Sequence, residues 1–266
     1  MLAEVGWNKE GPLPWIERDY TPVSSAKEWE VGKCDILIKI YNNDSATSWL
    51  HRIINDNVKT SFSKQPKVWF SQPIQTLEVP GLVNNVSSFD PSSILLILGG
   101  TGIVLLPQIM CHRDPYRKLG IGTPRKKQLH IPIDLIYSCR ADDILLLQEI
   151  KNFCQQSQIE GETKGIRRCT LLITGTEQAD GSSGVSRAFE NFSSQEKVDV
   201  VKVLQDLPNA RVLHSRLTLS VVETSVANMS QPSRVIVSGP SDFNVATKGM
   251  LIKANVNEEK ITILGA

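Results

Sequence analysis

The chain has 266 residues, which is enough for two domains, because domains usually hold ~100 to 200 residues. Its 29 basic and 28 acidic side chains leave a net charge of +1, so we expect neither a nucleic-acid partner nor binding to an anionic membrane surface. The five cysteines and four histidines are scattered, with no C-x-x-C pair, so we expect no metal site.

The first residues, MLAEVGWNKEGPLPW, contain no basic region followed by an apolar one. That order is what a secretory signal requires, and sparse cysteines suit a reducing compartment. The sequence therefore predicts a cytoplasmic protein, or one that faces the cytosol.

The first third of the chain is rich in short β-forming segments. DILIKIY, residues 35–41, alternates in part between apolar and polar side chains, and KVWFSQPIQTLEVPGL from Lys67 has the same character with two prolines. Such segments are typical of antiparallel strands joined by turns. We expect an antiparallel β domain over residues 1–90, ending in the turn-rich NNVSSFDPSS.

From Ile94 onward, apolar runs alternate with amphipathic segments. Five runs are expected to be strands: ILLIL, IPIDLIYSC, RRCTLLITGT, SRVIVSGP and KITILGA. Three segments are expected to be helices: VLLPQIM, ADDILLLQEIKNFCQQ and SDFNVATKGMLIKAN. The second would carry Asp142 and Asp143 in its first turn, where they favour the helix dipole. This alternation predicts a parallel sheet with helices on both faces, over residues 91–266.

ILLILGGTGIV, residues 94–104, joins the first of these strands to a glycine-rich turn. It lies in a long uncharged stretch, but Gly99, Gly100, Gly102 and Pro107 would interrupt a membrane-spanning helix, so we expect no transmembrane segment here. Two interpretations stay open. The glycines serve a tight turn that requires positive φ, or they let a pyrophosphate approach the N–H groups at the start of the next helix.

VSGPSDF, residues 237–243, is a second strand that ends in glycine and turns into a helix. The carboxyl ends of parallel strands line the crevice where ligands bind, so the two glycine-bearing ends favour a common site. Ser238 has the alternative role of an N-cap or a plain turn residue.

RDYTPVSS, residues 18–25, precedes the sheet. On an extended strand Arg18 and Tyr20 project to the same side, where the guanidinium pairs with a phosphate and the ring stacks on a flat ring system. A further basic stretch runs from Arg113 to Lys127. It is either a solvated loop or a contact for an acidic partner or a phosphate-bearing ligand.

The order of the motifs carries more information than any one of them. R-x-Y-T-P, the strand IKIY, ATSWL, LGGTGI and SGP followed by a helix together resemble the ferredoxin–NADP reductase superfamily of flavoprotein oxidoreductases. The resemblance covers nearly the whole chain. It implies an N-terminal FAD-binding antiparallel β-barrel and a C-terminal NAD(P)-binding α/β Rossmann-like domain.

The resemblance also implies roles for individual residues. Those that would hold the phosphates and the ring system of FAD are Arg18, Tyr20, Thr21, Thr47 and Ser48. Those that would border NAD(P)H are Gly99, Gly100, Thr101, Gly102, Ser138, Arg140, Gly239 and Pro240. Those implied beside the reacting rings are Tyr20, Thr21 and Ser238. Arg140 favours NADPH over NADH, because a guanidinium pairs bidentately with a 2′-phosphate.

The implied activity is that of an FAD-dependent NAD(P)H oxidoreductase, which passes a hydride from NAD(P)H to FAD and electrons on to an unidentified acceptor, a protein or a small molecule. Two features favour an alternative, a relative of the same fold that binds nucleotide or a protein partner without redox turnover. The R-x-Y-T motif begins at residue 18, so we expect an incomplete barrel, and Asp44 stands near the usual phosphate-loop glycine, where a carboxylate repels pyrophosphate. An unrelated α/β module whose glycines only serve turns is a third interpretation.

Overall fold

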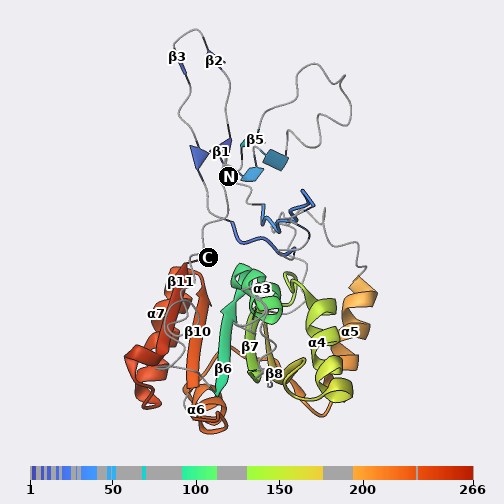
Figure 1. The fold of residues 1–266 in the computed structure, drawn as a ribbon, viewed down its shortest axis with the longest axis vertical. Coiled ribbons are helices and arrows are strands. Elements are labelled where there is room, and N and C mark those ends of the chain that lie inside the picture. The colour runs from blue at the N-terminus through green and yellow to red at the C-terminus, as the bar shows by residue number, and fades with distance from the viewer. Residues whose placement is uncertain are drawn as a thin grey trace, which may run out of the picture. The chain divides into compact units, whose positions relative to one another are not determined.

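The computed structural model of the chain describes residues 20–24, 28, 31–40, 47–48, 50–51, 92–112, 131–175, 194–231 and 233–265, and the backbone of short strands near the N-terminus. The chain divides into two compact units (Figure 1). One is Met1–Thr76 with Ala179–Glu190, and the other is Leu77–Gln178 with Asn191–Ala266. Within the described ranges, no helix combines the length and the apolar character needed to cross a membrane.

The described strands of the first unit are two residues long and pair antiparallel. β1 (Leu2–Ala3) pairs with β4 (Ile16–Glu17) and β5 (Val68–Trp69), and β2 (Trp7–Asn8) pairs with β3 (Gly11–Pro12). The antiparallel β-barrel expected over residues 1–90 stays a prediction.

The strand expected at residues 35–41 is shorter than the sequence indicates. Among its described residues, 35–40, Ile36 forms an isolated antiparallel bridge with Pro22. The Val23 N–H donates to the Asp35 carbonyl at 2.8 Å, but the Asp35 N–H donates to the Ser24 hydroxyl at 3.0 Å. A side chain thus takes a backbone donor that a continuous ladder would use.

The second unit contains a six-stranded parallel sheet in the order β11-β10-β6-β7-β8-β9. Its strands are β6 (Ser93–Gly99), β7 (Ile133–Arg140), β8 (Ile166–Thr174), β9 (Ala210–Leu213), β10 (Ser233–Gly239) and β11 (Ile261–Gly265). β6 and β10 are buried along their whole length, which explains the apolar runs ILLIL and VIV at their centres. The predicted α/β class of this part is confirmed, and each of the five expected strands is present.

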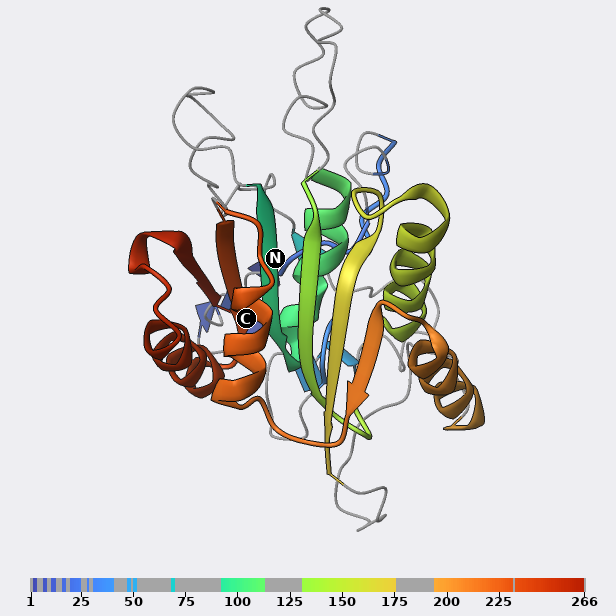
Figure 2. The same ribbon diagram turned by 90° about the horizontal axis from the view of Figure 1, so that it is seen from below.

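Helices cover both faces of this sheet. They are η2 (Gly100–Val104), α3 (Leu105–His112), α4 (Leu147–Glu160), α5 (Ser194–Asp206), α6 (Leu219–Ala227), α7 (Ser241–Lys253) and η4 (Glu258–Lys260). The chain steps from β6 through β7 and β8 to β9 in one direction, so right-handed crossings place α3, α4 and α5 on one face. It then returns to β10 on the far side of β6, which places α6 and α7 on the other face (Figure 2).

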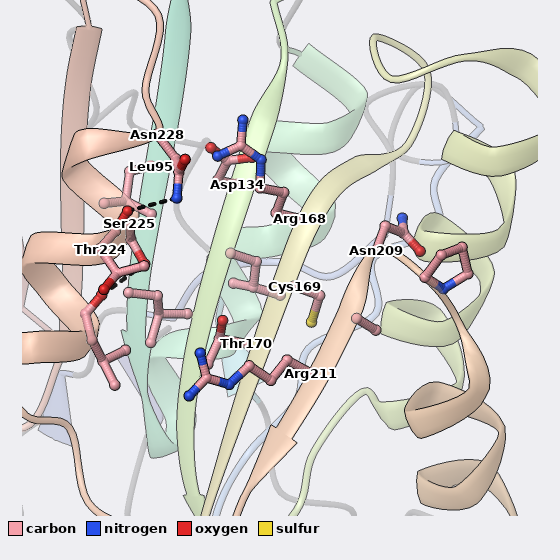
Figure 3. A pocket seen from close by; sticks show the side chains of 15 residues that line it. Leu95, Asp134, Arg168, Cys169, Thr170, Asn209, Arg211, Thr224, Ser225 and Asn228 are labelled. Carbon is pink, nitrogen blue, oxygen red and sulfur yellow. Dashed lines mark hydrogen bonds between the residues drawn. The ribbon is translucent and has the colours of Figure 1, made fainter.

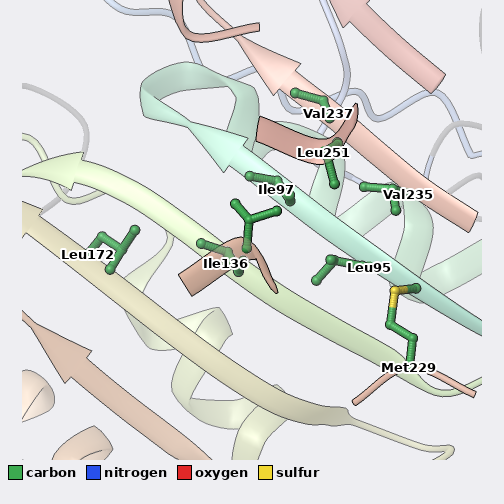
Figure 4. Packing of buried hydrophobic residues seen from close by; sticks show 9 residues of the cluster. Leu95, Ile97, Ile136, Leu172, Met229, Val235, Val237 and Leu251 are labelled. Carbon is green, nitrogen blue, oxygen red and sulfur yellow. The ribbon is translucent and has the colours of Figure 1, made fainter. Parts of the chain in front are cut away.

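The core under α6 and α7 centres on β6 and β10. Leu95 and Ile97 of β6 and Val235 and Val237 of β10 alternate along their strands, so they point to the same face. They pack with Ile136, Leu172, Val222, Met229 and Leu251 (Figure 4). This packing fixes the two strands against each other, and with them the two glycine-bearing carboxyl ends.

The second expected helix begins later than the sequence suggests. α4 starts at Leu147, after Leu146 in the left-handed region with φ 53°, so the prediction that Asp142 and Asp143 lie in its first turn is wrong. The physical reason is a turn after β7. The Asp142 carboxylate binds the Arg140 guanidinium, and the Asp143 N–H donates to the Arg140 carbonyl at 3.0 Å. β9, α5 and α6 were not expected from the sequence.

Candidate functional site

The two glycine-bearing strand ends meet at the point where the strand order of the sheet reverses. β7 lies on one side of β6 and β10 on the other, with Gly99 opposite Ser138 of β7 and Leu98 opposite Ser238 of β10. A Cβ on Gly239 would lie 3.2 Å from the Gly99 Cα, so the ends are in close contact. Open α/β sheets bind their ligands in the crevice at such a switch point. The structure thus brings together the two ends that the sequence indicated.

Gly100 is the glycine of this turn that requires a left-handed backbone. Its φ is +53°, and a Cβ built on it would find no atom within 4 Å. An L-residue is strained in that conformation, so the turn selects glycine here. The empty space beside its Cα also leaves room for a ligand to approach the backbone. Gly100 and Thr101 are half-buried, whereas Gly102 is buried.

Gly99 and Gly102 are glycines for a different reason, the lack of space. Gly99 is extended, with φ −118° and ψ 126°, and a Cβ there would lie 2.8–2.9 Å from ring atoms of Phe243. A Cβ on Gly102 would lie 2.2 Å from the Ser238 carbonyl oxygen. η2 and α7 therefore pack directly onto the ends of β6 and β10.

The start of the helical segment after β6 suits an anion. The first N–H groups of a helix have no partner within it, and they carry the positive end of the helix dipole. Neither η2 nor α3 has an acidic residue in its first turn. Glycine at position 100 leaves open space beside its Cα, at the kind of helix start to which phosphate groups bind in other proteins.

Arg140 has a partner other than the one that the resemblance implies. Its Nε lies 3.0 Å from Asp142 Oδ1 and its Nη2 lies 3.1 Å from Asp142 Oδ2, a bidentate ion pair. The pair is exposed, with 67% of the Arg140 side chain and 39% of the Asp142 side chain accessible, so it contributes at most about 1 kcal/mol. A 2′-phosphate at this end of β7 would nevertheless meet a carboxylate beside the guanidinium. Ser138 is half-buried and adjoins Gly99.

The other predicted residues of β10 lie where the strand turns into α7. Ser238 is buried, with 4% of its surface exposed, and its carbonyl oxygen lies against Gly102, where it leaves no space for a Cβ. Gly239 is buried, while Pro240 is exposed at the N-cap of α7.

Two residues that form this turn, Asn244 and Phe243, were not predicted from the sequence. The Asn244 side-chain amide donates to the carbonyls of Gly239 at 2.9 Å and Leu264 at 3.0 Å, which joins α7 to the ends of β10 and β11. The ring of Phe243 covers Gly99 and Gly239. In the sequence, the available indication is an aromatic residue and an asparagine, Phe243 and Asn244, shortly after the Gly-Pro turn.

The residues implied for FAD belong to the first unit. Tyr20, Thr21, Thr47 and Ser48 are half-buried. Arg18 lies outside the described residues. Their roles toward FAD stay predictions.

A separate cavity of about 220 Å³ lies between α6 and the sheet (Figure 3). It is lined by residues of β6, β7, β8, β9 and α6 and of the loops before β9 and after α6, toward the amino-terminal ends of the strands. Gly99, Gly100, Ser238 and Gly239 do not contribute to it. At one wall, Asp134 binds Arg167 through a buried pair of hydrogen bonds of 2.9 and 2.6 Å. The bond to Asp134 raises the pKa of Arg167. We assign this pair a structural role.

No protein-family model and no curated protein sequence matches the chain. Solved structures do. The CS-b5R domains of human Ncb5or in the NAD+ form match with a TM-score of 0.50 and 14% identity, over 98% of this chain and 58% of that chain. The Amycolatopsis cytochrome P450 reductase GcoB matches with a TM-score of 0.50 and 14% identity, over 98% of this chain and 59% of that chain.

These matches define the fold. The protein has the fold of the ferredoxin–NADP reductase-like FAD/NAD-binding proteins, so the resemblance indicated by the sequence motifs is confirmed at that level. The chain spans about three fifths of the length of the two matched structures.

Proposed function

We propose that the carboxyl ends of β6 and β10, at the switch point of the sheet, bind the dinucleotide NAD(P)H. The observation that carries the proposal is the meeting of two glycine-bearing strand ends, with Gly100 in the left-handed region and open space beside its Cα. An open glycine at the start of a helical segment lets a pyrophosphate reach backbone N–H groups.

Different residues at this site would then bind different parts of the dinucleotide. The N–H groups of Gly100 and Thr101 would bind the pyrophosphate, and Ser138 would hydrogen-bond the adenosine ribose. Gly239 and Pro240 would line the nicotinamide pocket on the side of β10. Because the guanidinium of Arg140 is paired with Asp142, we propose that Arg140 does not select NADPH over NADH.

We further propose that the whole protein is an FAD-dependent NAD(P)H oxidoreductase with an unidentified electron acceptor. When both cofactors are bound, NAD(P)H supplies a hydride that FAD accepts. The residues of the chain would align the flavin for this transfer. Tyr20 would pack on the flavin ring, Thr21 would hydrogen-bond at its reacting edge, and Arg18, Thr47 and Ser48 would hold the phosphates. The fold shared with the CS-b5R domains and with the P450 reductase supports this assignment.

A relative that binds nucleotide without redox turnover is the second candidate. The observation in its favour is Ser238, which is buried with 4% of its surface exposed. One of the three residues implied beside the reacting rings therefore has almost no exposed surface. Such a protein would bind NAD(P)H and leave it unoxidised.

An absorbance experiment separates the two candidates. The protein is incubated with FAD, excess FAD is removed, and NADH or NADPH is added without oxygen. We expect the retained flavin to be bleached by either nucleotide. Retained flavin that does not bleach, or bound nucleotide without flavin, would favour the non-redox relative. Loss of both ligands would refute the proposed function.

The nucleotide site itself is tested with Gly100→Ala. The new Cβ occupies the open face and strains a left-handed residue, so we expect nucleotide affinity to fall. Gly161→Ala is the matched control. Gly161 also has a positive φ, +100°, with no atom within 4 Å of its Cβ position, but it lies between α4 and the amino end of β8. Equal losses in both variants would show that strain alone, and not the site, lowers the affinity.

A further inference from the structure

The ring of Phe243 lies directly on the two glycines of the switch point. A Cβ on Gly99 would lie 2.8 Å from Phe243 Cδ1 and 2.9 Å from Cε1 and Cγ, and a Cβ on Gly239 would lie 2.7 Å from Cδ1. In each case the nearest atom belongs to this ring. The space that side chains would occupy at both strand ends is therefore filled by one aromatic residue of α7.

The ring is held in that place from two directions. Phe243 packs against the buried cluster of β6, β10, α6 and α7. The next residue, Asn244, donates from its backbone N–H to the Pro240 carbonyl at 2.9 Å and from its side chain to the carbonyls of Gly239 and Leu264. The first turn of α7 is thus attached to the ends of β10 and β11, which holds the backbone of Phe243 beside the two glycines.

The opposite side of the same junction is closed by η2. A Cβ on Gly102 would lie 2.2 Å from the carbonyl oxygen of Ser238 and 2.9 Å from the backbone nitrogen of Gly239. The junction of β6 and β10 is therefore held between η2 and Phe243. A smaller side chain at position 243 would leave the space beside both glycines unfilled.

We infer that Phe243 is a positioning residue of the nucleotide site. It sets the separation between the turn at Gly100, which would receive the pyrophosphate, and the turn at Gly239 and Pro240, which would line the nicotinamide pocket. The inference rests on the proposed function and adds a residue that binds no reacting atom. Catalytic geometry is sensitive to shifts of this kind, since a misplacement of about 1 Å costs up to ~100-fold in rate.

The test compares Phe243→Ala, Phe243→Leu and the control Val245→Ala. Val245 lies on the same helix with 73% of its surface exposed, so its truncation removes apolar atoms without touching the junction. Binding of NADH is measured by titration calorimetry on the full chain, with the unfolding temperature recorded for each variant. We expect about tenfold weaker binding for Phe243→Ala, partial recovery for Phe243→Leu, and less than a twofold change for Val245→Ala.

The outcomes distinguish failure of the proposed function from failure of the role inferred for Phe243. If the wild-type chain binds neither NADH nor NADPH, the proposed function fails. If the wild type binds and Phe243→Leu and Phe243→Ala keep wild-type affinity, Phe243 is only a packing residue and the inference is overturned. If Phe243→Ala does not fold, Phe243→Leu decides, because it retains an apolar side chain but not the flat ring that covers both glycines.

Discussion

Replacing Gly99 by alanine tests whether the ring of Phe243 is what requires glycine at that position. An added Cβ would lie 2.8–2.9 Å from three ring atoms. Carbon atoms in ordinary contact lie ~3.5 to 4.0 Å apart, so the overlap is close to 1 Å. The backbone gives no other reason, since φ −118° and ψ 126° suit any residue. Overpacking of this degree costs about 1 to 3 kcal/mol of unfolding free energy.

The same substitution in a Phe243→Ala background should cost almost nothing. The three nearest atoms to the new Cβ are then gone, and alanine reduces the freedom of the unfolded chain, which stabilises by about 0.4 to 1 kcal/mol. The two substitutions should therefore be coupled by about 1.4 to 4 kcal/mol. Gly102→Ala is the contrast. Its nearest atom is the backbone oxygen of Ser238 at 2.2 Å, so Phe243→Ala cannot relieve it.

Thermal unfolding followed by circular dichroism measures all of these variants. A change of 1 kcal/mol shifts the unfolding temperature by about 2 to 4 °C for units of this size. We expect Gly99→Ala to lower it by several degrees in the wild-type background and to raise it by about 1 to 4 °C after Phe243→Ala. An equal loss in both backgrounds would refute the reasoning, because the methyl group would then be clashing with something other than the ring.

Three further predictions follow from other contacts. Arg140→Ala should leave the affinities for NADH and NADPH in the same ratio, because Asp142 already pairs with the guanidinium; a selective loss of NADPH binding would contradict this. Asp134→Asn should lower the unfolding free energy by up to about 3 to 5 kcal/mol in urea, since it leaves the charge of Arg167 buried, and wild-type stability would count against a buried ion pair. Burial raises the pKa of the Cys139 thiol to about 12. Between the unfolded value of about 8.5 and that pKa, the unfolded chain binds fewer protons than the folded one, so stability falls as pH rises by at most about 1.4 kcal/mol per pH unit. Cys139→Ala should flatten that slope in unfolding curves above pH 8.5, and an unchanged slope would place the effect elsewhere.

The central strands were predictable because their burial leaves a continuous apolar run. β6 and β10 are covered on both faces, so their central positions select apolar side chains, and the runs ILLIL and VIV stand out. β9 has four residues and is only partly buried, which gives no comparable run. The start of α4 could not be placed because the Arg140 and Asp142 pair forms a turn from residues that, in sequence, look like a favourable helix start.

The glycine positions show why the site was only half predictable. Sequence alone indicated that Gly99, Gly100 and Gly102 belong to one turn and left two interpretations open, a structural turn or a phosphate-binding one. Both interpretations treat the three residues alike. The structure separates them, because backbone conformation accounts for Gly100, a side chain from another element accounts for Gly99, and a backbone oxygen accounts for Gly102. The last two depend on contacts more than 130 residues away along the chain, which no local pattern records.

The three different causes also change what glycine at each position of this turn implies about function. Close packing of η2 and Phe243 onto the ends of β6 and β10 would be needed in any protein that brings two strand ends together this tightly, whether or not it binds a nucleotide. Gly99 and Gly102 therefore carry little information about a ligand. Gly100 has no packing neighbour to explain it, and an L-residue at its φ would be strained rather than impossible. The open face of Gly100 is thus the feature of the turn on which the nucleotide assignment depends. A bound pyrophosphate should protect its N–H, and that of Thr101, from hydrogen exchange.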